Sequence, residues 1–322
     1  MGSPLARLPN TRHVMETLIK VGEFAPELQQ QIDREFRCVP AEVVLADDEL
    51  RRTVRGLITR SNYRVPIELM EQLPGLKVIA TSGVGYDGIP VAQAQQRNIV
   101  VTNTPGVLDD AVCELGVGLL LAMLRQIPQA DRHVREGLWQ QGAYPLTTSL
   151  RGMRIGIVGL GRIGQGMALR LEPFGVRIAY GGGRSRDVPW RYVESVPQLA
   201  EESDVLILTC KGGEETRHLI DASVIDALGH GWLVNMARGS VVDESALYHA
   251  LRHGSLRGAA LDVFEQEPLG DSLLRDLPNV LLSPHAGSAT QQTRVAMLRL
   301  TLDNLHAVLA GRAALTPVVL QA

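Results

Sequence analysis

The chain has 322 residues, 45% of them hydrophobic, which predicts two compact domains. Its formal net charge is −3 and no block of lysine and arginine stands out, so a basic face for nucleic acid or an anionic membrane is not expected. The longest apolar run, Leu115–Leu124, is too short for the roughly 20 residues of a membrane span. The scattered cysteines Cys38, Cys113 and Cys210 predict a reducing, cytoplasmic setting and no metal site.

The first hundred residues alternate between helical and strand-like patterns. We expect helices over residues 26–36 and 66–74, where apolar residues recur with helical spacing. Buried strands are expected over residues 54–59, 76–82 and 98–103. Short apolar runs between helices predict a small parallel sheet.

The middle of the chain begins with a long helical pattern over residues 109–139. Asp109 and Asp110 stand at its start, where acidic side chains favour the positive end of a helix. A second series of strands and helices then follows. Its buried strands are expected at residues 154–159, 176–181, 204–209, 231–237, 258–264 and 279–284. Such a series predicts a doubly wound sheet.

The last segment, residues 293–311, is again helical, and we expect it to return to the first unit. The predicted fold class is therefore α/β, with two Rossmann-like or flavodoxin-like doubly wound parallel-sheet domains, the first of them discontinuous. We expect the first domain at residues 1–104 plus 291–322 and the second, a Rossmann domain, at residues 105–290.

A glycine-rich turn, Gly159-Leu160-Gly161-Arg162-Ile163-Gly164, joins the first strand of this second series to a helix. In such a turn the first two glycines let the backbone approach a pyrophosphate, and the third lets helix and strand pack closely. The signature therefore predicts a dinucleotide site. The alternative is a tight structural turn that binds nothing.

The next strand ends in Gly181–Gly183, followed by Arg184, Ser185 and Arg186, where an NAD enzyme usually has an acidic residue. A guanidinium and a hydroxyl there favour a ribose 2′-phosphate, so NADP is preferred over NAD. The glycine run leaves the register open, with Arg186 as the second choice for the phosphate contact. In the alternative, the arginines are solvated and Asp187 serves NAD.

Three polar residues follow late strands of the second series, at the sheet edge where ligands bind. Arg238 can hold a 2-oxo acid carboxylate, His285 can protonate a carbonyl oxygen, and Glu267 can orient the imidazole and support its charge. Each also has an ordinary structural explanation. Arg238 could pair with Asp243, Glu267 could be a solvated loop acid, and His285 could be a core histidine. Together they predict reduction of a 2-oxo acid.

The stretches "GLGRIGQGMALRLEPFG", "VNMARGSVVDESAL", "GAALDVFEQEPL" and "LSPHAGSAT" resemble the D-isomer-specific 2-hydroxyacid dehydrogenase family, within it the glyoxylate/hydroxypyruvate reductase branch. The resemblance covers nearly the whole chain after about residue 55. It implies that residues 1–104 plus 291–322 are a substrate-binding domain and that residues 105–290 are an NADP-binding domain. It also implies an active site in the cleft between these domains and a homodimer formed through the cofactor domains. It also implies Arg238 as carboxylate anchor, His285 as proton donor and Glu267 as its partner.

The resemblance further assigns binding residues. The backbone N–H groups of Val84 and Gly85 would bind the substrate carboxylate together with Arg238, as an exposed turn of this kind can. The cofactor residues that it implies are Gly159, Gly161, Arg162, Ile163, Gly164, Arg184, Ser185, Met236, Asp262, His285 and Gly287. Cys113 departs from the family pattern, and we expect it to be a buried apolar side chain.

The predicted function is an NADPH-dependent reductase of small 2-oxo acids, with glyoxylate and hydroxypyruvate as leading substrates. A hydroxyphenylpyruvate reductase or another D-2-hydroxyacid dehydrogenase is the alternative among the same enzymes. A non-catalytic, nucleotide-sensing corepressor-like protein is the alternative from another class. Formate enzymes resemble this family but pair their histidine with glutamine, so Glu267 counts against formate. No single residue excludes phosphite.

Overall fold

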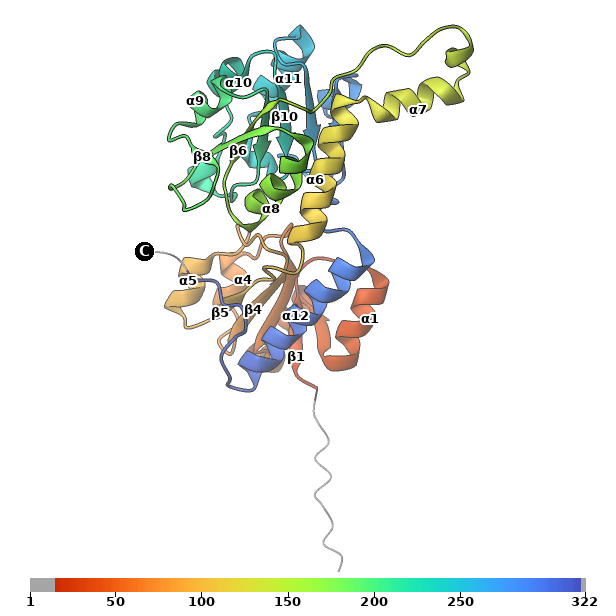
Figure 1. The fold of residues 1–322 in the computed structure, drawn as a ribbon. Helices are drawn as coiled ribbons and strands as arrows, with labels where there is room; N and C mark the ends of the chain where they lie inside the picture. The colour runs from red at the N-terminus through yellow and green to blue at the C-terminus, as the bar shows by residue number, and fades with distance from the viewer. Residues whose placement is uncertain (1–14, 320–322) are drawn as a thin grey trace, which may run out of the picture. The chain divides into compact units, whose positions relative to one another are not determined.

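The computed structural model describes residues 15–319, and the chain forms two compact units. Among the described residues, the first unit comprises 15–104 and 297–319, and the second comprises 105–296. The second boundary therefore lies at 296/297 rather than at the expected 290/291, inside the last helix. Figure 1 shows the elements of each unit in chain colours.

A five-stranded, fully parallel sheet forms the centre of the first unit, in the order β2-β1-β3-β4-β5. This is the flavodoxin-like doubly wound order. Its strands are β1 Thr17–Lys20, β2 Arg37–Pro40, β3 Gly56–Arg60, β4 Val78–Ser82 and β5 Val100–Thr102. The last three are the strands expected from the sequence. The sequence did not reveal β1 and β2, because they bury only Leu18, Ile19 and Val39 and contain no continuous apolar run.

Helices cover both faces of this sheet. They are α1 Pro26–Glu35, α2 Ala41–Ala46, α3 Asp48–Thr53, α4 Ile67–Glu71, α5 Val91–Gln96 and α12 Gln291–Leu309. Leu298, Leu302 and Leu305 of α12 are buried with Ile32 and Phe36, so α12 lies beside α1 (Figure 1). The C-terminal helix thus completes the first core, and the expectation of a discontinuous first domain is confirmed.

The second unit contains a seven-stranded parallel sheet in the order β12-β11-β10-β9-β6-β7-β8. Its strands are β6 Arg154–Val158, β7 Arg177–Gly181, β8 Arg191–Tyr192, β9 Val205–Leu208, β10 Trp232–Asn235, β11 Gly258–Leu261 and β12 Val280–Leu282. From β6 the chain adds β7 and β8 on one side, and it then adds β9 to β12 on the other side, so the strand order reverses between β6 and β9. At such a switch point, ligands bind beyond the carboxyl ends of the strands. The six predicted strands are present, and β8 is an addition of two residues.

Two helical layers enclose this sheet. Buried side chains of α9 Val196–Glu201, α10 Ala222–Leu228 and α11 Glu244–His253 form one apolar core with the strands. On the other face, α6 Asp109–Leu124 packs against α8 Arg162–Leu171. Short 3-10 helices occupy the connections at Leu138–Gln140, Glu172–Phe174, Glu214–Thr216, Gly239–Val241 and Leu273–Asp276.

The expected single helix over residues 109–139 is wrong. It is two helices, α6 and α7 (Ile127–Arg135), with a 59° bend between them. Gln126 adopts a left-handed backbone with φ of 50°, and the second residue of α7 is a proline, so the helical hydrogen-bond ladder is interrupted there. Helix α7 and the segment after it project from the sheet of this unit (Figure 1). We call α7 together with residues 136–146 the arm.

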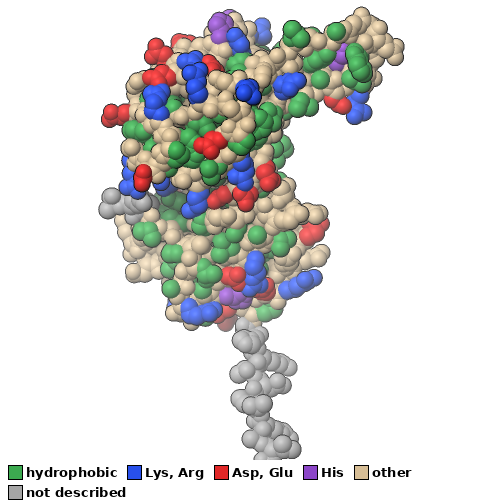
Figure 2. All heavy atoms as spheres, viewed as in Figure 1, with side chains coloured by type: hydrophobic (Ala, Val, Ile, Leu, Met, Phe, Trp, Pro, Cys, Tyr) green, Lys and Arg blue, Asp and Glu red, His purple; other side chains and the backbone are tan. Residues whose placement is uncertain are grey.

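The described surface agrees with the mixed charge of the chain. On the face seen in Figure 2, lysine and arginine side chains are interspersed with aspartate and glutamate. Within residues 15–319 no single helix has the length and apolar character to cross a membrane, and only the bent pair α6 and α7 reaches that threshold when counted together. In the same range, no three His, Cys, Asp or Glu side chains are grouped to hold a metal ion.

Candidate active site

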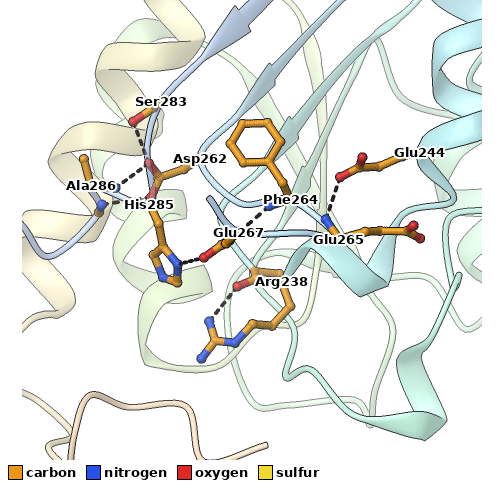
Figure 3. Close-up of polar contacts among 11 residues, drawn as sticks. Arg238, Glu244, Asp262, Phe264, Glu265, Glu267, Ser283, His285 and Ala286 are labelled. Carbon is orange, nitrogen blue, oxygen red and sulfur yellow. Dashed lines mark hydrogen bonds and ion pairs between the residues drawn. The ribbon is translucent and has the colours of Figure 1, made fainter. Parts of the chain in front are cut away.

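The carboxyl edge of the second sheet brings a histidine and a carboxylate into direct contact (Figure 3). Nδ1 of His285, which follows β12, lies 2.6 Å from Oε2 of Glu267, which follows β11. Their side chains are 31% and 25% exposed, so the pair is shielded yet reachable. The other oxygen of Glu267, Oε1, accepts the backbone N–H of Phe264 at 3.1 Å. The carboxylate is therefore fixed at both oxygens.

Asp262, the residue after β11, organises the loop that carries His285. It is 2% exposed, and its Oδ1 accepts the Ser283 hydroxyl at 2.5 Å and the Ala286 N–H at 2.7 Å. Its Oδ2 accepts the Gly287 N–H at 2.8 Å, and its carbonyl accepts the N–H of His285 at 2.8 Å. These bonds hold His285 at a φ of 51°, a left-handed backbone that costs about 1–3 kcal/mol in a residue other than glycine. Strain of this kind concentrates at functional sites.

Charge around Glu267 favours its ionised form. Burial by itself would raise the pKa of this carboxyl, but the hydrogen bond and charge of His285 lower it. The Phe264 N–H and the positive charge of Arg238 act in the same direction, and the net result is a pKa below the ordinary glutamate value. Glu267 is thus a carboxylate that can support a positively charged imidazole.

Arg238 follows β10 and belongs to a tightly folded turn. The Asn235 side chain, 1% exposed, donates to the Arg238 carbonyl at 3.0 Å and accepts the Ala237 N–H at 3.0 Å. A Cβ at Gly239 would lie 1.8 Å from the carbonyl carbon of Phe264, so only glycine lets this turn press against the Glu267 loop. Figure 3 shows the Arg238 side chain beside Glu267 and His285. The three residues predicted to act together are adjacent.

A second histidine–glutamate contact lies beside the first. Nε2 of His218 is 2.5 Å from Oε1 of Glu265, and the Glu265 N–H donates to Oε1 of Glu244 at 2.6 Å. His218 also donates its backbone N–H to Ser240, in the turn after Arg238. It therefore links the turn after β10 to the loop after β11. The sequence offered no signal for His218, since only the fold brings residues 218 and 265 together.

The environment of Glu244 differs from that of Glu267. Burial raises the pKa of the Glu244 carboxyl, and the negative charges of Glu265 and Glu267 raise it further. The N–H of Glu265 opposes this by favouring the charged form. The Glu244 carboxyl at the start of α11 and the Glu267 carboxyl in the loop after β11 thus have pKa values displaced in opposite directions.

The glycine-rich turn fits a bound dinucleotide. Gly159 has a φ of +91°, and a Cβ there would lie 2.5 Å from the Cα of Cys210. A Cβ at Gly164 would lie 2.3 Å from the Gly159 carbonyl oxygen, so this glycine lets α8 pack against β6. A Cβ at Gly161, in contrast, would meet no atom within 4 Å. Two glycines are required by the fold itself, and the third borders open space where a pyrophosphate fits.

The start of α8 is also suited to an anion. No side chain caps its first turn, so its N–H groups face the space beside Gly161 with the positive end of the helix. Arg162, on this turn, pairs with Asp109 of α6 at 3.2 Å and is 60% exposed. Ile163 accepts a bond from Cys113, whose buried sulfur packs between α6 and α8. Burial raises the pKa of the Cys113 thiol to about 11, as expected for an apolar, unreactive cysteine.

The remaining predicted residues are distributed as follows. Arg184 and Ser185 are exposed beyond the end of β7, and neither side chain is bonded to another residue within 15–319. Met236, 7% exposed, lies near Gly116 of α6. Val84 and Gly85 belong to the first unit, in the turn after β4. Their N–H groups make no hydrogen bond inside the described chain, while the Val84 carbonyl accepts Asn103 at 2.8 Å.

The fold is that of a dinucleotide-binding α/β oxidoreductase, and the carboxyl edge of its second sheet holds an imidazole–carboxylate pair. The sequence matches the model of the D-isomer specific 2-hydroxyacid dehydrogenase, NAD binding domain, over residues 117–287. The chain belongs to the D-isomer specific 2-hydroxyacid dehydrogenase family. It is an enzyme of that family and uses a nicotinamide cofactor.

Individual relatives agree with this assignment. The chain is 42% identical to a glyoxylate/hydroxypyruvate reductase A of Arabidopsis thaliana, over 91% of this chain and 95% of the relative. It is 41% identical to a hydroxyphenylpyruvate reductase of Plectranthus scutellarioides, with the same coverage of 91% and 95%. Among solved structures, the NADPH-dependent glyoxylate/hydroxypyruvate reductase of Sinorhizobium meliloti, in complex with NADP and malonate, superposes with a TM-score of 0.89. That pair is 42% identical and covers 94% of this chain and 97% of the other.

Proposed function

We propose that this protein is an NADPH-dependent reductase of small 2-oxo acids, with glyoxylate and hydroxypyruvate as its substrates and glycolate and D-glycerate as its products. The observation that carries the proposal is the 2.6 Å contact between His285 and Glu267, with Arg238 beside it, at the edge of a dinucleotide-binding sheet. The similarity to enzymes that carry these two substrates in their names supports the choice of substrate.

The chemistry follows from the side chains. When bound, NADPH would supply a hydride for the carbonyl carbon of the substrate. His285 donates a proton to the carbonyl oxygen, and the Glu267 carboxylate stabilises the protonated imidazole before that transfer. Arg238 holds the substrate carboxylate by paired N–H donors. This division of roles needs no metal ion.

The substrate carboxylate also needs neutral donors. We assign this role to the backbone N–H groups of Val84 and Gly85, which have no partner within the described chain. Two adjacent amides of this kind form an anion-binding concavity. On the cofactor side, Gly159, Gly161 and Gly164 shape the turn, and Asp262 and Gly287 hold the histidine loop.

Preference for NADPH rests on Arg184 and Ser185. Both are exposed at the end of β7, which is the second strand of this sheet in chain order. An NAD enzyme carries an acidic residue at this place. An arginine there pairs with the ribose 2′-phosphate by charge-assisted hydrogen bonds. The similarity to an NADPH-dependent reductase that was solved with NADP supports this choice.

A homodimer is the second part of the proposal. The arm has no buried residue in α7, and it exposes Ile127, Val134, Leu138, Trp139 and Leu146. Trp139 is 66% exposed, so a large apolar side chain lies in contact with water. Figure 2 shows the arm. A second copy of the cofactor unit would cover these side chains.

Hydroxyphenylpyruvate is the second candidate substrate, because the chain is similar over 91% of its length to a reductase named for it. A substrate panel decides between the candidates. Purified protein is mixed with NADPH and with glyoxylate, hydroxypyruvate or hydroxyphenylpyruvate, and oxidation of NADPH is followed by absorbance. The proposal expects the highest kcat/KM with the first two. No oxidation with any 2-oxo acid would refute it.

A further inference from the structure

The segment Gly183–Arg186, which carries Arg184 and Ser185, is fastened at both ends by tyrosine hydroxyls. The hydroxyl of Tyr180 accepts the backbone N–H of Arg186 at 2.8 Å and donates to its carbonyl at 3.3 Å. The hydroxyl of Tyr192 donates to the Gly183 carbonyl at 2.6 Å. Between these two anchors, the segment makes no other side-chain hydrogen bond within residues 15–319.

The two tyrosines form one unit. Tyr180 of β7 and Tyr192 of β8 are register partners in the parallel sheet, so their side chains leave the same face. Their rings are 5.3 Å apart with an angle of 52° between planes, and Tyr180 is 1% exposed. Because the buried ring cannot move freely, its hydroxyl is a fixed anchor for an otherwise exposed segment. The short strand β8 therefore positions Tyr192 beside Tyr180.

An anchor matters here because the segment begins with Gly183 and follows two further glycines, Gly181 and Gly182. A Cβ at Gly181 would lie 2.6 Å from the Val193 carbonyl oxygen, and Gly182 has a φ of +70°, so both are required by the backbone. Gly183 borders open space, with no atom within 4 Å of a Cβ placed there. A free glycine-rich chain loses conformational entropy when it is ordered. Hydroxyl anchors order the segment before any ligand arrives.

We propose that the Tyr180 and Tyr192 hydroxyls are positioning residues for cofactor selectivity, because they hold Arg184 and Ser185 ready for a 2′-phosphomonoester. This inference rests on the proposed NADPH preference. It predicts that loss of either hydroxyl weakens binding of nucleotides that carry a 2′-phosphate, and leaves binding of nucleotides without one unchanged.

The test uses Tyr180→Phe and Tyr192→Phe, each of which removes a hydroxyl and keeps the ring. Tyr248→Phe is the matched control, because the Tyr248 hydroxyl makes no hydrogen bond in the described chain. Titration calorimetry measures binding of adenosine 2′,5′-bisphosphate and of 5′-AMP to the full-length protein. We expect each test variant to bind the bisphosphate about five- to tenfold more weakly, as the loss of one net hydrogen bond implies. Binding of 5′-AMP should stay within about twofold.

Arg184→Ala, measured alongside, separates this inference from the proposed function. If Arg184→Ala loses bisphosphate affinity and both tyrosine variants retain it, the anchoring role is refuted and the NADPH preference stands. If Arg184→Ala also retains it, both are refuted. Equal weakening of both nucleotides in a tyrosine variant would indicate a general structural role and would likewise overturn the inference. Tyr192 is only partly buried, so its variant remains informative if Tyr180→Phe fails to fold.

Discussion

Nδ1 of His285 and Oε2 of Glu267 are 2.6 Å apart, although the residues follow different strands, β12 and β11. Adjacent parallel strands end at the same edge, and Asp262 fixes the loop after β12 that carries His285. The contact leaves Nε2 as the ring atom that can face a substrate. A carboxylate on one nitrogen and a reacting oxygen at the other is the arrangement that makes an imidazole a proton donor.

Glu267→Gln should reduce kcat and change the acid stability. Glutamine keeps the size of the side chain but lacks the charge that stabilises a protonated imidazole, so kcat should fall by about 10–100-fold. The fold lowers the pKa of Glu267, so the ionised side chain stabilises the folded protein. This stabilisation is complete above the glutamate pKa of the unfolded chain, 4.5, and is lost as the pH falls through the lowered pKa of the folded chain. The difference in Tm between the two proteins should therefore be present at pH 5 and shrink at more acidic pH. A difference that grows on acidification would contradict this account.

Gly161→Ala and Gly164→Ala should separate cofactor binding from folding. The added methyl group at Gly164 meets the Gly159 carbonyl, so we expect a stability loss of about 1–3 kcal/mol in urea unfolding without cofactor. At Gly161 the methyl group enters open space, so stability should be kept while NADPH binds at least about tenfold more weakly. Fluorescence titration of NADPH provides the second measurement. Unchanged NADPH affinity in Gly161→Ala would argue against a pyrophosphate at this turn.

His218→Ala should lower kcat without weakening NADPH binding. The change removes the contact with Glu265 and frees the loop that holds Glu267, and a misplacement of the acid–base pair is expected to cost about tenfold. His218→Gln, which keeps a side-chain donor, should recover much of the rate. His230→Ala, at an exposed position, serves as the control. Equal rates for the alanine variant and the wild type would show that the second histidine–glutamate contact is dispensable.

Ile127→Asp combined with Val134→Asp should produce a monomer. Both side chains are exposed on α7, at 52% and 56%, so the monomer fold should tolerate the change. Two carboxylates cannot be buried in an apolar interface without a large desolvation cost. Light scattering after gel filtration should give about twice the 35.0 kDa chain mass for the wild type and the chain mass for the variant. Leu273→Asp, exposed but off the arm, should stay dimeric. A monomeric wild type would rule out the proposed dimer.

Much of the fold could be predicted from the sequence because its strands are buried on both faces. The strands β6, β9 and β10 are almost entirely apolar, and such runs can be recognised from the sequence alone. The strands β1, β2 and β8 were missed because their sequences, TLIK, RCVP and RY, contain no continuous apolar run and bury at most two residues each. The break at Gln126 was missed because the apolar spacing continues through it.

The contact between the predicted acid–base residues could be expected from their places in the sheet. Arg238, Glu267 and His285 each follow a strand of the second sheet, and a common edge brings such residues together. The contact between His218 and Glu265 depends on tertiary packing, so no spacing in the sequence predicts it. The Asn235 contacts lie within its own turn, and the sequence analysis did not single them out. The same holds for Tyr180 and Tyr192, whose hydroxyls act on the backbone of a loop.

The most direct measurement is the turnover of glyoxylate by His285→Asn and His285→Ala, together with their affinity for NADPH. Asparagine tolerates the left-handed backbone at this position, so the loop should keep its shape while the proton donor is lost. The account predicts that kcat falls by about 10²–10⁴-fold while the Kd for NADPH changes by less than about threefold. Turnover at the wild-type rate in either variant would contradict the assignment of His285 as the proton donor.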